Sequence, residues 1–296
     1  MHSFSSKTKQ ELCKLTGFEL CCRRAELAGI IAFAGSFDGN EIRINTESSP
    51  VARHLHNLVK ELFEVQAENK IKNMGRLHLY TVIIPDAYLV LEKLGIGLMP
   101  MRVQSSVVKR DCCCRAFVRG AFLGAGSISA PEKTYHMEII TRHLKISENF
   151  GNLIERFEIK PKVTMRKGNH VYYFKGSEAI SDMLVLLGAH NSMMEFLNVK
   201  IVKEMRNHAN RLVNCETANV DKAINASMEQ VRIIQEIDQK IGLGNLPPEL
   251  EKLARLRVEN PEDSIRELGE RYEPVISKSC VNHRLNRIIE YYKEKL

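Results

Sequence analysis

Residues Cys21–Phe37 have the sequence CCRRAELAGIIAFAGSF, and residues 112–128 have the related sequence CCCRAFVRGAFLGAGSI. A shift of 91 positions, from Cys21 to Cys112, aligns the two stretches, including a pair of cysteines at the start and an Ala-Gly-Ser triplet near the end. An internal repeat of this quality predicts a duplicated half-domain.

Each copy carries small residues on one face of a predicted apolar helix: Ala28, Gly29 and Ala32 in the first copy, and Gly120, Ala121 and Gly124 in the second. Small residues three and four positions apart allow two helix backbones to approach closely. We therefore expect the two helices to pack against each other across a pseudo-twofold axis.

The first copy also resembles a known motif, because LAGIIAFAG at Leu27–Gly35 is similar to the LAGLIDADG motif of homing endonucleases. In that family the penultimate residue is an acid that binds Mg²⁺ and activates the water that attacks a DNA phosphate. Ala34 and Ala125 occupy these positions here, and a methyl group can neither ligate a hard cation nor position a metal-bound water. The nearest acid, Asp38, belongs to a predicted hairpin turn. We expect the scaffold without the nuclease, so the chain is not predicted to be an enzyme and no catalytic residues are assigned.

Composition and charge indicate a globular chain with an anionic partner. The 296 residues are 44% hydrophobic and 27% charged, with a formal net charge of +7. The sequence has no apolar run near the roughly 20 residues that span a bilayer and no signal-peptide core, so we expect no membrane partner and a cytoplasmic location. The excess of positive charge favours nucleic acid, although a mildly basic surface is the alternative interpretation.

The eight cysteines include two runs at equivalent places in the repeat, Cys21-Cys22 and Cys112–Cys114. Neither run has the C-x₂-C spacing of a tetrahedral zinc site, and a cytoplasmic chain is not expected to hold disulfides. We therefore expect no metal and no cofactor, with the cysteines as small free thiols. The alternative is that the two runs meet across the pseudo-twofold axis and bind a metal or sense redox state.

Hydrophobic periodicity predicts an α+β fold with half-repeats at about 1–95 and 108–197. The resemblance to LAGLIDADG proteins implies that the two halves form a duplicated LAGLIDADG-like αββαββα domain at 1–197, and an all-α helix-turn-helix domain is expected to follow. In the first half, besides the repeat helix, we expect helices at 7–17, Ser49–Glu64 and Asp86–Leu94 and strands at Glu41–Asn45, Phe63–Ile71 and Leu77–Ile84. In the second half we expect helices at 112–125, Ser147–Phe157 and Ser177–Leu187 and strands at Ser127–Ala130, His136–Thr141, Lys162–Arg166 and Val171–Phe174.

Such halves in homing endonucleases form a saddle of antiparallel strands that lies on duplex DNA. The resemblance makes five cations candidate phosphate contacts: Arg43, Arg76, Arg166, Lys167 and Lys175. The alternative is that these charges only solvate an exposed sheet face.

A basic helical linker is expected at 198–218, where Lys203, Arg206 and Arg211 are candidate contacts to a DNA backbone. A solvated linker helix without DNA contacts is the alternative. The remainder, 219–296, is expected to be helical, with a long helix over Val220–Ile241 that ends at Gly242.

The last fifty residues predict a three-helix unit. The Ser264–Glu267 stretch has the form of a capping box that opens the second helix, and Ser277 is placed to cap the third. On the third helix Val281, Leu285, Ile288 and Ile289 form one apolar arc, and no acid occurs between Ser277 and Ile289. Amides, hydroxyls, imidazole and guanidinium groups on the last helix of such a unit suit contacts in a DNA major groove. The candidate DNA-binding residues are Ser277, Lys278, Ser279, Asn282, His283, Arg284, Asn286 and Arg287.

The chain contains several further distinctive stretches: FSSKTKQEL, CCRRAELAG, RGAFLGAGSIS with PEKTYHMEI, LLGAHNSMMEF, VKEMRNHANRLVNCETAN and ISKSCVNHRL. In these stretches, which are spread over nearly its full length, the chain resembles the WhiA family of bacterial DNA-binding regulators. The resemblance implies a transcription factor of the sporulation or cell-division type that binds double-stranded DNA through its helix-turn-helix and is associated with the nucleoid.

The resemblance leaves the LAGLIDADG-like domain as an aid to DNA binding or a surface for a protein partner. Internal pseudo-symmetry removes the usual reason to dimerise, so we expect a monomer. Two other functions stay open: an active LAGLIDADG endonuclease or maturase, and a protein-interaction scaffold.

Overall fold

The computed structural model describes residues 3–75 and 77–295, in two compact units divided between Lys203 and Glu204. In the described residues no helix combines the length and apolar character that a membrane crossing needs. Each unit has its own hydrophobic core.

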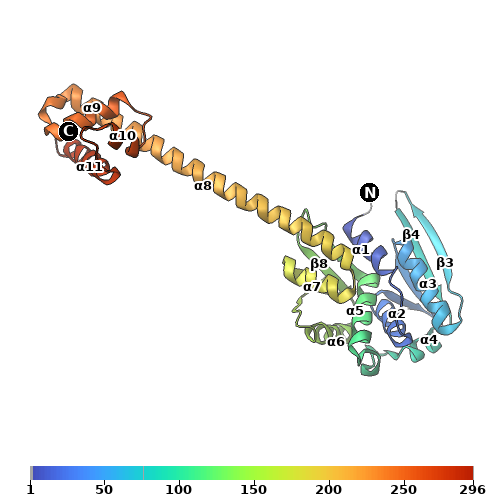
Figure 1. Cartoon of the computed structure of the whole chain (residues 1–296). Helices are drawn as coiled ribbons and strands as arrows, with labels where there is room; N and C mark the ends of the chain where they lie inside the picture. The colour runs from blue at the N-terminus through green and yellow to red at the C-terminus, as the bar shows by residue number, and fades with distance from the viewer. Residues whose placement is uncertain (1–2, 76, 296) are drawn as a thin grey trace. The chain divides into compact units, whose positions relative to one another are not determined.

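The first unit repeats one order of elements twice (Figure 1). The first half contains α2 (Leu20–Ala34), β1 (Gly35–Asp38), β2 (Glu41–Thr46), α3 (Ser49–Phe63), β3 (Glu68–Met74), β4 (Leu77–Ile84) and α4 (Ala87–Lys93). The second half contains α5 (Asp111–Ala125), β7 (Gly126–Ile128), β8 (His136–Thr141), α6 (Leu144–Glu155), β9 (Lys162–Arg166), β10 (Asn169–Lys175) and α7 (Ser177–Leu187). Helix α1 (Phe4–Leu12) precedes the first half, and the hairpin β5 (Ile96–Leu98) and β6 (Met101–Val103) and the short helix η1 (Ser105–Val108) lie between the halves.

The two sheets have the same antiparallel topology, with strand orders β1-β2-β4-β3 and β7-β8-β10-β9. Both halves therefore follow the expected αββαββα order, which confirms the predicted fold class and the duplication. The sequence did not predict β1, β5, β6 or η1, which are too short to show a clear period.

Helices α2 and α5 are the centre of the first unit, where Gly29 and Gly120 allow their backbones to touch. A Cβ built on Gly29 would lie 2.2 Å from the carbonyl oxygen of Phe117, and one on Gly120 would lie 2.0 Å from that of Glu26. Real Cβ atoms do not approach carbonyl oxygens so closely. The predicted close pairing of the two repeat helices is confirmed.

Helix α8 (His190–Lys240) is longer than the sequence predicted, because it contains both the basic stretch and the helix expected to begin at Val220. Residues 198–240 contain neither proline nor glycine, so no residue in this range terminates the helix. Every residue of α8 from Glu204 to Ala226 is exposed.

The rest of the second unit is η2 (Leu243–Asn245), α9 (Pro248–Glu259), α10 (Ile265–Arg271) and α11 (Lys278–Lys295). These elements bury a compact apolar cluster that includes Ile237 of α8, Leu253 of α9, Leu268 of α10 and Val281 and Leu285 of α11. The predicted three-helix unit is present, with the end of α8 added to its core.

Candidate nucleic-acid interface

The turn between α10 and α11 fixes how the last helix is presented. The predicted capping box at the start of α10 is formed, since Ser264 and Glu267 bond each other's backbone amides. At the end of α10, the Ile276 amide donates to the Gly269 carbonyl oxygen at 3.1 Å, and a Cβ on Gly269 would lie 2.5 Å from the Ile276 carbonyl oxygen. The Cys280 amide donates to Ser277 Oγ at 3.3 Å, so Ser277 caps α11 as expected.

Helix α11 has one buried and one displayed face. Val281, Leu285 and Ile288 are at most 1% exposed. The displayed face carries Ser279, Asn282, His283 and Asn286, which are all exposed and stand at positions i, i+3, i+4 and i+7 of one helix face. Ser277 and Lys278 are exposed at the amino end of the helix.

The two arginines of this helix are held by neighbours from other helices. The Arg284 guanidinium lies over the Tyr272 ring, 4.9 Å from its centroid, and its Nη1 is buried without a hydrogen-bond partner in the described part of the chain. Arg287 Nη1 forms an ion pair with Glu249 Oε1 of α9 at 2.9 Å. Sequence reasoning missed Tyr272 and Glu249, because periodicity along α11 does not report residues on α9 or after α10.

In the basic stretch of α8, Lys203 is held by residues of the first unit, whereas Arg206 and Arg211 are exposed. Lys203 Nζ donates to the Pro131 carbonyl oxygen at 2.7 Å and lies 4.8 Å from the centroid of the Tyr135 ring, so its charge is used in the packing of the first unit. Arg206 and Arg211 are exposed, and Arg211 Nε donates to the Asn207 carbonyl oxygen of its own helix at 3.2 Å.

Strand pairing shows which charges share the exposed face of each sheet, because paired residues and every second residue along a strand point to the same side. In the first half these positions carry three cations and three acids: Arg43, Lys70, Lys72, Asp38, Glu41 and Glu68. Arg43 is paired with both Asp38 at 2.8 Å and Glu41 at 3.0 Å. This face is neutral.

In the second half the corresponding face carries three cations, Lys162, Arg166 and Lys175, against Glu138. Arg166 Nη1 lies 3.6 Å from Glu138 Oε2, and Lys175 lies over the Tyr173 ring, 5.3 Å from its centroid. Lys167 is exposed in the β9–β10 turn. Over the described strand positions, the second sheet is therefore the more basic of the two. Arg76 lies outside the described residues.

The positions that carry acids in homing endonucleases lie at the carboxyl ends of the paired helices. Ala34 is the last residue of α2 and Ala125 the last of α5. Next to Ala34, Arg142 Nη2 donates to the Gly35 carbonyl oxygen at 2.8 Å, and two residues after Ala125 the Ser127 hydroxyl donates to Glu138 Oε1 at 3.4 Å. Asp38, the nearest acid in the sequence, pairs with Arg43.

A buried ion pair joins the two halves. Arg119 of α5 donates from Nε and Nη2 to Glu26 Oε2 of α2, at 2.9 and 2.7 Å, and His54 Nε2 of α3 donates to Glu26 Oε1 at 2.7 Å. Burial alone would raise the pKa of the Glu26 carboxyl, but the His54 hydrogen bond and the Arg119 charge outweigh it and lower that pKa below its ordinary value. The carboxylate is therefore ionised in the interior, where both of its oxygens accept hydrogen bonds.

Three family models together match most of the chain. They are the WhiA N-terminal LAGLIDADG-like domain over residues 20–96, the WhiA LAGLIDADG-like domain over 114–206 and the WhiA C-terminal HTH domain over 209–292.

Relatives of the same kind are similar over nearly their whole length. A probable cell division protein WhiA of Alkaliphilus metalliredigens is 40% identical, with 97% of this chain and 96% of the relative covered. That of Heliobacterium modesticaldum is 41% identical, with 97% and 94% covered. The crystal structure of full-length WhiA from Thermatoga maritima has the same fold, with a TM-score of 0.64, 24% identity and 99% of both chains covered.

Proposed function

Because the chain belongs to the WhiA family, we propose that it is a sequence-specific DNA-binding regulator of transcription, of the cell-division and sporulation type. The observation that carries the proposal is the displayed face of α11. Over residues 277–289 this helix has no acid, and its exposed positions hold hydroxyl, amide and imidazole groups beside Lys278.

The chemistry of this face suits duplex DNA. Asn282 and Asn286 present carboxamides, the group that forms paired hydrogen bonds with adenine in the major groove. On the same face, Ser279 adds a hydroxyl donor on a short side chain and His283 an imidazole donor on a longer one. Lys278 and the capping Ser277 stand at the amino end of the helix, where they suit contacts to phosphate. We assign these residues to DNA binding as the primary set.

We also assign Arg284 and Arg287 to DNA binding, although each already has a partner within the protein. Arg287 must exchange Glu249 for a phosphate or a guanine, whereas the Tyr272 ring fixes the orientation of the Arg284 guanidinium in the free protein.

We propose Arg206 and Arg211 as phosphate contacts on the basic linker, residues 198–218, between domains at 1–197 and 219–296. Lys203 makes a weaker candidate because Pro131 and Tyr135 already hold its ammonium group.

We propose that the LAGLIDADG-like unit assists binding without cutting. Alanine replaces the acid at both positions that hold Mg²⁺ in homing endonucleases, and Arg142 adds a positive charge beside Gly35. The second sheet, with its excess of positive charge, is the half that suits a DNA backbone or an acidic protein partner. The protein would act as a monomer in the cytoplasm, on the nucleoid.

One experiment separates the regulator from its alternatives. The purified full chain is mixed with fragmented genomic DNA and Mg²⁺, and both the protein-bound fragments and any new ends are sequenced. A shared short sequence with intact ends supports the proposal. New ends at a defined sequence would establish an endonuclease, and no enrichment of any fragment would favour the protein-interaction scaffold.

Two charge-matched variants test the assigned face. Lys278→Ala removes a cation from the amino end of α11, and Lys293→Ala removes one from its carboxyl end. We expect Lys278→Ala alone to weaken binding, for all sequences alike, and Asn282→Ala to relax the preference at one base pair at a cost of about 1–3 kcal/mol. Equal affinity of Lys278→Ala and Lys293→Ala, with an unchanged Asn282→Ala site, would remove α11 from the interface.

A further inference from the structure

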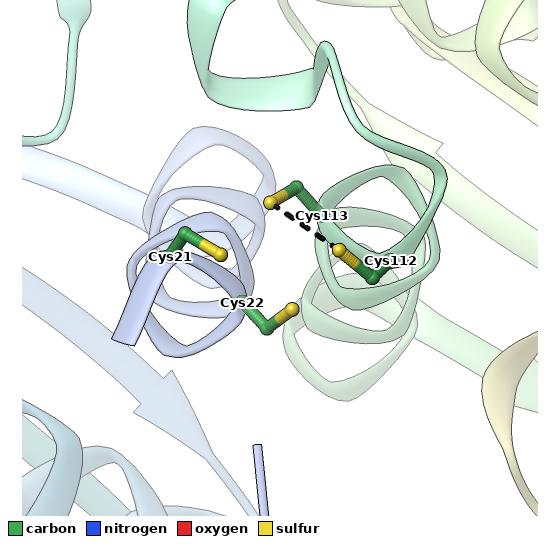
Figure 2. A group of neighbouring side chains, drawn as sticks. All are labelled: Cys21, Cys22, Cys112 and Cys113. Atoms are coloured by element: carbon green, nitrogen blue, oxygen red, sulfur yellow. Dashed lines mark hydrogen bonds between the residues drawn. The ribbon is translucent and has the colours of Figure 1, made fainter. Parts of the chain in front are cut away.

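Four cysteine thiols meet at the amino ends of α2 and α5. Cys21 and Cys22 lie in the first turn of α2, and Cys112 and Cys113 lie in the first turn of α5. Their Sγ atoms all lie within 4.8 Å of one another, and those of Cys112 and Cys113 are 3.9 Å apart. Figure 2 shows the four sulfurs directed into one space between the two helix ends.

We propose that these four cysteines bind one Zn²⁺ ion, which joins the two half-repeats. In a tetrahedral site with Zn–S bonds of about 2.3 Å, the sulfurs stand about 3.8 Å apart. The observed 3.9 Å already meets this spacing, and the upper limit of 4.8 Å exceeds it by about 1 Å. Rotation of the side chains therefore closes the site without movement of either helix.

The duplication explains why the spacing in the sequence did not reveal this site. A C-x₂-C motif supplies two ligands from one turn of chain, whereas here each half supplies an adjacent pair and the pseudo-twofold axis places the pairs face to face. In the 91-residue repeat Cys21 is equivalent to Cys112, and Cys22 is equivalent to Cys113. The short distances between the four sulfurs support the alternative that the two runs meet, and the proposed Zn²⁺ ion departs from the expectation of free thiols, which stays a prediction.

The surroundings suit a metal–thiolate centre. Four thiolates and one Zn²⁺ carry a net charge of −2, and the positive ends of two helix dipoles face this charge. Cysteine binds metal as the thiolate, so the ion displaces thiol protons when it binds.

Accessibility is graded across the four ligands. Cys22 and Cys113 are each 4% exposed, Cys21 is half-buried and Cys112 is exposed. An ion can therefore enter from the side of Cys112 and Cys21 and be held against the two buried thiols. The site lies at the other end of the helices from Ala34 and Ala125, about 20 Å away along α2, so it is separate from the place where homing endonucleases bind Mg²⁺.

The compactness of the four sulfurs favours a single ion. Iron–sulfur clusters also use four cysteines, but several irons and their sulfides in the centre hold the four thiolates farther apart than one ion does. A soft set of four sulfur ligands in tetrahedral arrangement is typical of zinc and excludes the hard cations Mg²⁺ and Ca²⁺.

The test uses the full chain, reduced and freed of metal by a chelator. Zn²⁺ is titrated against a chromogenic chelator, and Co²⁺ is added separately to record thiolate-to-metal charge transfer and tetrahedral d–d absorption. We expect one Zn²⁺ per chain, a tetrahedral four-thiolate Co²⁺ spectrum that Zn²⁺ abolishes, and a higher melting temperature with zinc.

The variants are Cys112→Ser, which changes the exposed ligand, and Cys215→Ser, which changes an exposed cysteine outside the cluster. Cys112→Ser should weaken zinc binding at least tenfold and reduce the Co²⁺ charge-transfer band, and Cys215→Ser should bind zinc as the wild type does. Zinc binding unaffected by Cys112→Ser, no binding by the wild type at micromolar zinc, or a disulfide between the helices in place of the metal in protein purified with reductant would each overturn the proposal.

Discussion

The α2–α5 pair and helix α11 use their residues in opposite ways. In the pair, glycine and alanine bring two backbones into contact, and the charged side chains Glu26 and Arg119 satisfy each other in the interior. On α11 the apolar residues form only the buried face, and the polar ones are displayed. The first region is therefore expected to determine whether the protein folds, and the second to determine what the folded protein binds.

The largest effect is expected from Gly120→Ala. The new Cβ would lie 2.0 Å from the Glu26 carbonyl oxygen, a backbone atom that no rotamer change can remove, so the two helices must separate. We expect a loss of about 4 kcal/mol or more in the free energy of unfolding, measured by urea denaturation. Gly97→Ala is the control, because its Cβ would meet Arg102 at ordinary contact distances, 3.4 Å from the side chain and 4.0 Å from the backbone oxygen. Equal stability of both variants would show that the close approach does not hold the pair.

Arg119→Met is expected to cost somewhat less. It leaves the buried Glu26 carboxylate with His54 as its remaining partner, and breaking a buried ion pair in this way typically destabilises a protein by about 3 kcal/mol. The double variant Glu26→Leu/Arg119→Met should recover most of this loss, since it removes the unpaired charge as well. If the double variant is no more stable than the single one, the helix pair depends on the ion pair itself and not on the absence of an unpaired charge.

The same carboxylate predicts a pH dependence of stability. The pKa of Glu26 is lower in the folded state than its ordinary value, so the folded state binds fewer protons than the unfolded chain. The stabilisation is therefore present above the ordinary pKa of 4.5 and is lost as the pH falls toward the folded-state value. In Arg119→Met this pH dependence should become weaker, because the Arg119 charge no longer lowers the pKa of Glu26 and only His54 opposes the effect of burial. Denaturation of both proteins between pH 3 and 7 measures the two slopes, and parallel slopes would contradict this assignment.

Substitutions at exposed charged residues on and beside α11 should change the affinity for DNA and have little effect on the free energy of unfolding, unlike those in the α2–α5 pair. Arg287→Ala should weaken DNA binding by about 1–3 kcal/mol if this residue contacts a base, whereas Glu249→Ala should strengthen it, because it frees Arg287 and removes an acid. The Arg287–Glu249 pair is 43% and 48% exposed, so neither change should alter the free energy of unfolding by more than about 1 kcal/mol. Fluorescence anisotropy with the recovered DNA site measures both affinities. Weaker binding by Glu249→Ala would mean that the ion pair positions Arg287 for DNA.

The sequence predicted what is periodic or repeated. The 91-residue repeat with glycine and alanine on one helix face predicted the helix pair, and the apolar arc of α11 predicted its buried side. The neighbours of the site could not be predicted, because Glu249, Tyr272 and Pro131 meet Arg287, Arg284 and Lys203 only after folding. The four-thiol cluster could be predicted only in part. The repeat places the cysteines at equivalent ends of the two helices, but the sequence alone does not give the distance between their sulfurs.

The smallest expected effect compares the two sheets of the first unit. Arg166→Ala removes a cation from a face with three cations and one acid, and Arg43→Ala removes one from a neutral face where Asp38 and Glu41 already hold it. If the second sheet contacts the DNA backbone, Arg166→Ala should weaken binding to all sequences alike and reduce the slope of log affinity against log salt by about 1, with Arg43→Ala unchanged. Equal slopes for both variants and the wild type would mean that neither arginine contacts phosphate. An effect of Arg43→Ala alone would show that Asp38 and Glu41 release this arginine to DNA and that the net charge of a sheet face does not decide which half binds.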